Sequence, residues 1–313
     1  MNKLVVKDND VNWRIDKFIR KVYPSLKLSE VYKFLRNKKI KVNNKKVRPD
    51  YRLNLNDEIT CYFNAEVYTK QVETKDLKQE FSVIYEDKNI LVVYKPAGLV
   101  VHIDHEKTTN TLINQVLNYL ISKNEYDPKL EQSFAPSLVN RIDRNTAGLV
   151  MIAKNRKSLD ILNEKIKLHE INKTYLAKVY GIIDPKQAIK KAFLTKFSDK
   201  NQVLITPKPI NPNSKEIITE YKLIEHKQNQ SLIEINLITG RTHQIRAHFN
   251  YLGYPLVGEQ KYTKNEFKHL SKRKYQALVA FQIQFNFKSS ADILDYLNHK
   301  VITLPNEIIA KIL

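Results

Sequence analysis

The chain has 313 residues, of which 42% are hydrophobic and 27% charged, a composition typical of folded globular proteins. It contains no run of about 18 apolar residues and no leader-like N-terminal stretch, so we expect a cytoplasmic protein with no membrane partner. Cys61 is the only cysteine, which excludes an intramolecular disulfide and cysteine-based zinc sites. At about twice the length of a typical domain, the chain is expected to form two.

The positive charge is large and concentrated near the N-terminus. The formal net charge is +20 and the pI is near 9.6, which points to a polyanionic partner. Residues 14–52 hold fourteen Lys or Arg against three Asp or Glu. Nucleic acid is favoured over a membrane surface, because no basic amphipathic anchor lies beside an aromatic insertion face. A lysine-rich genome is the alternative explanation for the total charge.

Two helices are predicted in this basic region. The first has one apolar face and is ended by Pro24; that face consists of Ile15, Phe18, Ile19 and Val22. The second helix is expected to start from Ser29 as N-cap, with Val31, Phe34 and Leu35 facing inward. Its basic side chains remain available for phosphates, and these are Lys33, Arg36, Lys38 and Lys39.

A hairpin is predicted next, turning at Asn43 and Asn44, because asparagine tolerates positive φ. The order of helix, helix and hairpin, with KLSEVYKFLRNKKIKVNNKKVRPDYRLNLNDEI inside it, resembles the alpha-L RNA-binding module first known from a ribosomal small-subunit protein. The resemblance covers residues 12 to about 63. The alternative is a solvated basic face on a structural subdomain.

The domain boundaries follow from composition. We expect a small α/β module over residues 1–63, a polar linker over 64–80 and a large domain over 81–313. The large domain should be α+β, with a mixed, largely antiparallel sheet flanked by helices and loops. Its expected strands are 81–85, 90–95, 148–153, 174–181 and 231–238, and its expected helices lie around 112–120, 156–169 and 242–252.

The segment SLVNRIDRNTAGLVMIAKN at 137–155 places a polar loop directly before an apolar strand. Taken alone, Asp143 could simply close an Asx-turn. The loop nevertheless resembles the signature loop of the RluA-type pseudouridine synthases, with Arg141, Ile142, Asp143, Thr146, Ala147 and Gly148 at the matching positions. The segments VIYEDKNILVVYKPAGLVVH at 83–102 and INLITGRTHQIRAHFNYLGYPLVGEQKY at 235–262 agree in order and spacing. Asn140, where many members have His, leaves subgroup and target open.

The resemblance spans residues 81–313 and implies isomerisation of uridine to pseudouridine in RNA without a cofactor. It assigns Asp143 as the catalytic carboxylate, Arg246 as its partner and Tyr175 as the ring that stacks on uracil. A neighbouring guanidinium favours the ionised carboxylate. With the N-terminal module, the match favours 23S-type ribosomal RNA as the partner of a monomeric enzyme. Transfer RNA is the alternative substrate, and a non-catalytic ribosome-assembly protein is the alternative function.

The resemblance and the helix near 242–252 also yield RNA-binding residues. Arg141 is expected to fill the gap left by an extruded nucleotide. A helix N-terminus binds phosphate readily, and the loop, strand and helix-start candidates for RNA contact are Arg144, Thr146, Lys173, Arg241, Thr242 and His243. His243 and His248 are five residues apart, which is a poor spacing for two metal ligands on one helical face, so no metal site is expected.

Overall fold

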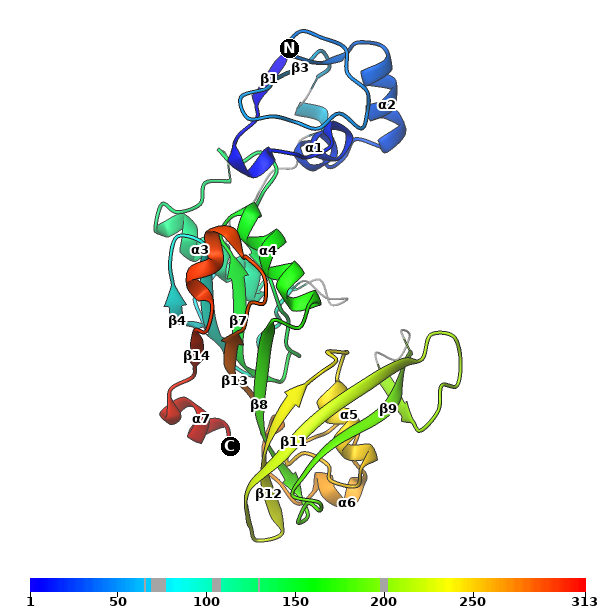
Figure 1. The fold of residues 1–313 in the computed structure, drawn as a ribbon, viewed down its shortest axis with the longest axis vertical. Coiled ribbons are helices and arrows are strands. Elements are labelled where there is room, and N and C mark those ends of the chain that lie inside the picture. The colour runs from blue at the N-terminus through cyan, green and yellow to red at the C-terminus, as the bar shows by residue number, and fades with distance from the viewer. Residues whose placement is uncertain (65, 69–76, 103–107, 129, 198–201) are drawn as a thin grey trace. The chain divides into compact units, whose positions relative to one another are not determined.

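The computed structural model describes residues 1–64, 66–68, 77–102, 108–128, 130–197 and 202–313. The chain forms two compact units, and Figure 1 labels most of their helices and strands. Unit 1 consists of Met1–Leu77, Val116–Pro136 and Lys154–Lys157, and unit 2 of the remaining residues. The linker expected at 64–80 lies partly outside the described residues; its described part contains the short 3-10 helix η2 (Glu66–Tyr68).

Unit 1 packs two helices against a small antiparallel sheet in the order β1–β3–β2. Its elements are β1 (Asn2–Val5), η1 (Asp8–Asp10), α1 (Ile15–Val22), α2 (Leu28–Arg36), β2 (Ile40–Val42) and β3 (Glu58–Cys61). The apolar face predicted for the first helix is confirmed, since Ile15, Phe18 and Ile19 are fully buried. Cys61 is buried in the same core.

The predicted N-cap of α2 is wrong, whereas the predicted turn at Asn43 and Asn44 is present. The helix begins at Leu28 after Lys27, so Ser29 is not the N-cap; the Lys27 N–H instead donates to the Glu30 carboxylate at 2.9 Å. Asn43 and Asn44 both have positive φ, 51° and 61°. The predicted hairpin is short, because its far side is a single bridge residue and β2 pairs with β3.

Unit 2 is built on an eleven-stranded sheet with the main order β10–β9–β11–β12–β8–β13–β7–β5–β4. β14 pairs with β13, and β6 with β7. Only β13 and β7 run parallel among these described pairs, so the predicted mixed, largely antiparallel sheet is confirmed. The strands are β4 (Ser82–Glu86), β5 (Ile90–Lys95), β6 (Ser137–Leu138), β7 (Ala147–Ala153), β8 (Ile171–Tyr180), β9 (Gln187–Phe197), β10 (Gln202–Thr206), β11 (Lys215–Lys227), β12 (Gln230–Leu237), β13 (Leu278–Phe285) and β14 (Val301–Thr303).

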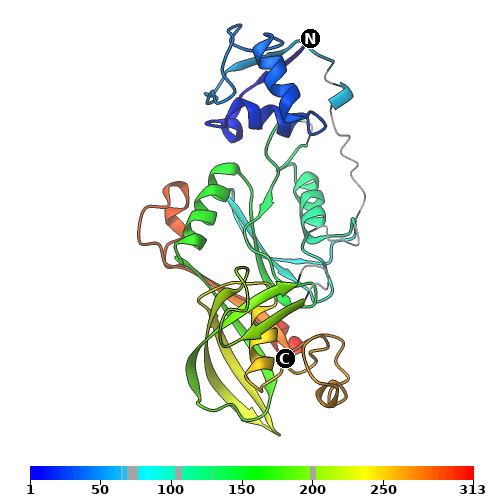
Figure 2. The same ribbon diagram turned by 90° about the vertical axis from the view of Figure 1, so that its right-hand side faces the viewer.

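The remaining helices are short. They are α3 (Leu112–Ser122), α4 (Arg156–Lys167), α5 (Gln244–Tyr251), α6 (Asn265–Lys268), α7 (Asn306–Ile312) and the 3-10 helix η3 (Asp292–Leu297). The part of α3 from Val116 onward belongs to unit 1. Figure 2 shows η3 beside α4. No helix in the described residues is long and apolar enough to cross a membrane.

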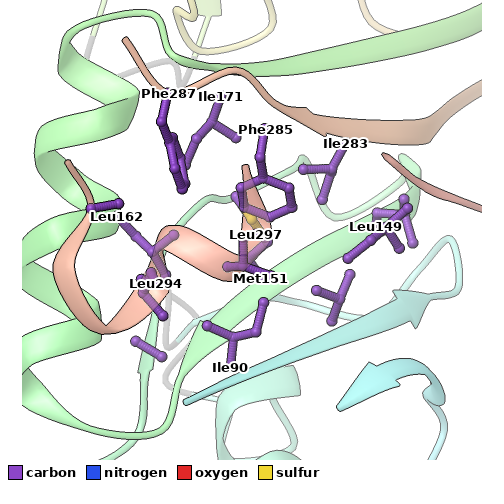
Figure 3. Packing of buried hydrophobic residues seen from close by; sticks show 14 of the residues in the cluster. Ile90, Leu149, Met151, Leu162, Ile171, Ile283, Phe285, Phe287, Leu294 and Leu297 are labelled. Atoms are coloured by element: carbon purple, nitrogen blue, oxygen red, sulfur yellow. The ribbon is translucent and has the colours of Figure 1, made fainter. Parts of the chain in front are cut away.

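The two faces of the large sheet are covered differently. On one face Leu162 of α4 and Leu297 of η3 pack against Met151 of β7 and neighbouring strands (Figure 3). On the other, Ala247 of α5 packs against β9, β10 and β11. Because side chains alternate along a strand, Leu176 of β8 points into the first core and Tyr175 points to the face that α5 covers.

Candidate active site

The loop that carries Asp143 ends where the fully buried strand β7 begins. The Thr146 N–H donates to the Asp143 carbonyl at 3.1 Å, which closes a turn. Beside it, the buried Lys95 amine donates to the carbonyls of Pro96, Leu99 and Arg144 at 2.8, 2.9 and 3.0 Å. Burial lowers the pKa of Lys95 to about 7, against the opposing charge of Asp143. The turn and the Lys95 hydrogen bonds together hold the Asp143 carboxylate in a fixed place.

Gly148 explains how β7 can approach β13 so closely next to this loop. Its φ is +137°, and a Cβ added there would lie 2.5 Å from the backbone nitrogen and oxygen of Ala280. Only glycine fits such a position without displacing backbone. The parallel pairing of β7 and β13 thus depends on one residue of the signature loop.

Arg246 connects Asp143 to a second, buried carboxylate. Its Nη1 donates to Asp143 Oδ2 at 3.1 Å, while Nε and Nη2 donate to the two oxygens of Glu259 at 2.7 and 2.9 Å. The expected contact between Arg246 and Asp143 is present, whereas Glu259 was not predicted. Burial alone would raise the pKa of Glu259, but the hydrogen bonds and charge of Arg246 hold it below its ordinary value. Glu259 therefore fixes the fork that orients Arg246.

His243 lies near the same oxygen of Asp143 that Arg246 contacts. Its Nε2 is 3.8 Å from Asp143 Oδ2, and its Nδ1 shares a short hydrogen bond with the Tyr262 hydroxyl. Burial lowers the pKa of His243; the charge of Asp143 opposes this shift, and Arg246 and Lys261 reinforce it. The lowered pKa favours a neutral His243 ring beside the carboxylate, not a cation.

Tyr175 reaches the site through strand register. Tyr175 of β8 pairs with Ala280 of β13, which in turn pairs with Gly148 of β7. The ring is 7% exposed, and burial followed by the charge of Asp143 raises the pKa of its phenol. The hydroxyl thus stays protonated at neutral pH. An aromatic ring and a carboxylate brought together in this way suit a planar base attached to a sugar.

A cavity of about 290 Å³ opens in front of Asp143. Arg144, His243 and Arg246 line it, together with Lys261 and Lys274, which were not predicted as site residues. The cavity is therefore positively charged around a single carboxylate. The described residues contain no group of three or more His, Cys, Asp or Glu side chains placed to hold a metal ion.

The other predicted RNA-contacting residues of unit 2 occupy varied positions. Arg141 is exposed and lines a separate cavity with Asn140, whose side-chain Oδ1 accepts the Met151 N–H at 2.8 Å. Lys173 is half-buried, and burial lowers its pKa. Thr146 is buried and accepts a hydrogen bond from Gln276 at 3.1 Å, so its hydroxyl has a structural partner.

The two remaining groups of predicted contacts are exposed. Arg241 and Thr242 precede α5, where the Gln244 side chain accepts the Arg241 N–H at 3.0 Å. In unit 1 the four predicted basic residues, Lys33, Arg36, Lys38 and Lys39, are all exposed. Their RNA contacts stay predictions. Glu259 lies in GEQKY, inside the third motif, and that position was the one available signal for it.

Comparisons with known proteins identify the family and the N-terminal domain. The RNA pseudouridylate synthase model matches residues 89–251, and the S4 domain model matches residues 13–59, where the alpha-L module was expected. An RNA pseudouridine synthase of Mycoplasma genitalium, described as uncharacterized, is 35% identical over 291 residues, covering 91% of this chain and 89% of that protein. Ribosomal large subunit pseudouridine synthase C of Buchnera aphidicola subsp. Baizongia pistaciae is 32% identical over 278 residues, covering 87% and 84%.

A solved structure supports the fold alone. Human RNA Pseudouridylate Synthase Domain Containing 1 superposes with a TM-score of 0.55 at 19% identity, covering 78% of this chain and 97% of that one. The family predicted from three ordered motifs is confirmed by the sequence matches. This chain belongs to the RNA pseudouridine synthase family and carries an RNA-binding S4 domain.

Proposed function

We propose that this enzyme isomerises uridines of large-subunit ribosomal RNA, with Asp143 as the catalytic carboxylate. The observation that carries the proposal is the 3.1 Å contact from Arg246 to Asp143, with Arg246 itself held by Glu259. This arrangement places a carboxylate beside a guanidinium, at the wall of a positively charged cavity. No other carboxylate lines that cavity among its described residues.

The reaction needs such a group and no redox partner. The bond from ribose C1′ to uracil N1 breaks, the ring turns, and a bond from C1′ to C5 forms. C5 then loses its proton to solvent, and N1 takes one up, so the atoms balance. Asp143 can serve as nucleophile toward the ribose or the uracil ring, or as base toward a ribose proton. Each route requires the ionised carboxylate beside the nucleotide.

Tyr175 and Arg141 would act on the base and on the RNA stack. The buried ring of Tyr175 offers a stacking surface for uracil, and its protonated hydroxyl can donate a hydrogen bond. The exposed Arg141 would occupy the gap that the extruded nucleotide leaves. Wild-type turnover on folded RNA in both Tyr175→Phe and Arg141→Ala variants would remove these two assignments.

Two facts support the substrate class. The S4 domain supplies a basic RNA-binding surface, and one relative that covers most of the chain is named for the large ribosomal subunit. Transfer RNA is the competing substrate. A cytoplasmic location and a monomeric state fit either choice and belong to the same proposal.

Release of tritium from uridine labelled at C5 tests the proposal directly. Transcribed ribosomal RNA and transfer RNA would each be incubated with the wild-type enzyme and with Asp143→Ala. We expect release from the ribosomal transcript that the mutation abolishes, with RNA binding retained. Release from transfer RNA alone would overturn the substrate class, and release by Asp143→Ala would overturn the catalytic assignment. Partly assembled ribosomal particles serve as a further substrate if both bare RNAs fail.

A further inference from the structure

A basic segment follows Glu259 and leads back to the sheet at β13. Residues 261–274 contain six Lys or Arg and one Glu, with α6 in the middle. Lys261 and Lys274, at the two ends of this segment, line the cavity that holds Asp143. The roles proposed above use neither lysine. Their position at the reaction site therefore calls for a separate explanation.

The charges around the cavity favour an anionic ligand. Four cations line it, Arg144, Arg246, Lys261 and Lys274, and Asp143 is the single carboxylate among its described lining residues. Arg246 donates to Asp143 and to both oxygens of the buried Glu259, so four cations share these two carboxylates and the cavity keeps an excess of positive charge. The anionic groups of a uridine within RNA are its flanking phosphates.

Both lysines are positioned by anchored backbone. The Lys261 N–H donates to Glu259 Oε1 at 2.7 Å, next to the fork that holds Arg246. At the other end, the Arg273 side chain donates to the backbone carbonyls of Ile312 and Leu313. Lys274 then lies over the ring of Tyr275, with its Nζ 5.3 Å from the ring centre. Cations held in this way need little reordering when a ligand arrives.

Tight packing fixes Tyr275, and through it the place of Lys274. A Cβ added to Gly258 would lie 2.6 Å from the Tyr275 carbonyl oxygen, and one added to Gly98 would lie 2.5 Å from the Tyr275 hydroxyl. Gly98 also donates its N–H to the carbonyl of Arg144 in the Asp143 loop, at 2.8 Å. Lys274 is thus tied to the same framework as the catalytic loop.

We propose that Lys261 and Lys274 form a phosphate subsite that binds the phosphodiester adjoining the target uridine. The subsite would hold the sugar of the extruded nucleotide in front of Asp143, which makes these lysines positioning residues of the reaction. This inference rests on the proposed function, because it takes the ligand of the cavity to be a uridine within RNA.

The test removes the lysine charge from the protein and the phosphate charge from the RNA, separately and together. The protein variants are Lys261→Met and Lys274→Met, with Lys264→Met as the matched control. Lys264 belongs to the same segment, but its side chain is 82% exposed and lies 4.0 Å from Glu266. The RNA probes are substrate RNAs with one uncharged methylphosphonate linkage, placed 5′ or 3′ of the target uridine.

Turnover and binding are both measured. We expect Lys261→Met and Lys274→Met each to raise KM about tenfold while kcat changes much less, since a charge-assisted contact contributes about a tenfold change in affinity. A methylphosphonate on one side of the target uridine, 5′ or 3′, should raise the KM of the wild type about tenfold. In at least one of the two variants, the same linkage should raise KM little further, because the lysine that contacts this phosphate is already absent.

Two results would overturn the subsite. One is an equal methylphosphonate cost in the wild type and in both variants; the other is a loss in Lys264→Met as large as in the pocket variants. Repeating the cycle as equilibrium affinity in Asp143→Asn protein separates the two proposals. If the wild type releases no tritium from any RNA, the proposed function fails, and the affinity cycle still decides whether these lysines bind phosphate.

Discussion

At the residue scale, the motif positions predicted the contact between Arg246 and Asp143 but not the residues that hold Arg246 and the loop in place. Glu259 and Lys95 are buried ionisable groups whose partners are distant in sequence or are backbone carbonyls. A sequence shows neither burial nor a carbonyl's direction. Ser29 is not the N-cap because the helix starts after Lys27, two residues earlier, where the Glu30 carboxylate accepts the Lys27 N–H.

Glu259→Gln should separate the orientation of Arg246 from RNA binding. The amide keeps the shape but turns an N–H group toward the guanidinium, so Arg246 loses its bidentate partner. We expect kcat to fall about tenfold to a hundredfold with RNA affinity little changed. Breaking a buried ion pair should also lower the free energy of unfolding by about 3 kcal/mol. Tritium release and urea denaturation measure the two effects. Glu266→Gln, at an exposed ion pair, should change neither.

The same carboxylate gives the stability a defined dependence on pH. The pKa of Glu259 is lower in the folded protein than its ordinary value of 4.5, so the unfolded chain takes up a proton first as the pH falls. Ionised Glu259 therefore contributes stability above about pH 4.5, and this contribution is lost as the pH falls through the lower folded pKa. Urea unfolding between about pH 3 and pH 6 should show a shallower acid loss in Glu259→Gln than in the wild type. Parallel curves would contradict this.

At the scale of elements, the sequence predicted the strands that are apolar or strictly alternating, such as β5, β7 and β12. It did not identify β9, β10 or β11. β9 exposes lysine and isoleucine on one face and buries only a short stretch against α5, so its alternation is broken in the sequence. The pairing of β13 with β7 and β8 depends on contacts far apart in the chain, which local patterns do not contain.

Gly148→Ala tests whether the close approach of β7 and β13 sets the site. The added methyl group meets backbone atoms of Ala280 at a φ of +137°, and neither strand can move without disturbing the sheet. We expect a loss of about 3 kcal/mol or more in the free energy of unfolding, together with loss of turnover. Gly240→Ala is the control for stability, since nothing lies within 4 Å of its added Cβ and its φ is not positive. Equal unfolding curves for the two variants would contradict the packing argument.

At the scale of the whole molecule, the order of the motifs predicted that the S4 region precedes the catalytic region. It did not predict which segments of the chain make up unit 1. Unit 1 includes Val116–Pro136 and Lys154–Lys157 as well as the S4 region. Within it, Asn9 accepts the Arg156 N–H at 3.0 Å, and the Arg156 guanidinium lies 4.6 Å from the centre of the Trp13 ring. Residues on either side of the segment that carries Asp143 thus fold with the S4 domain.

The basic surface of the S4 domain should determine how strongly RNA binding depends on salt. The chain has an excess of 20 positive charges, so binding of RNA should weaken with salt in any case. A binding surface differs from attraction of RNA by the total charge of the protein in one measurable way. Only the charges of the binding surface set the slope of log affinity against log salt. Each phosphate contact made by α2 and the residues after it should add roughly 0.7 to 0.9 to that slope.

Two quadruple variants with the same loss of charge decide between these cases. The first changes the α2 group to methionine, namely Lys33, Arg36, Lys38 and Lys39. The second changes four exposed lysines in or next to β9 and β11, namely Lys186, Lys191, Lys222 and Lys227. Equilibrium binding over a range of salt should show a slope lower by roughly three in the first variant and nearly unchanged in the second. Equal slopes in the two variants would mean that total charge, and not the S4 surface, holds the RNA.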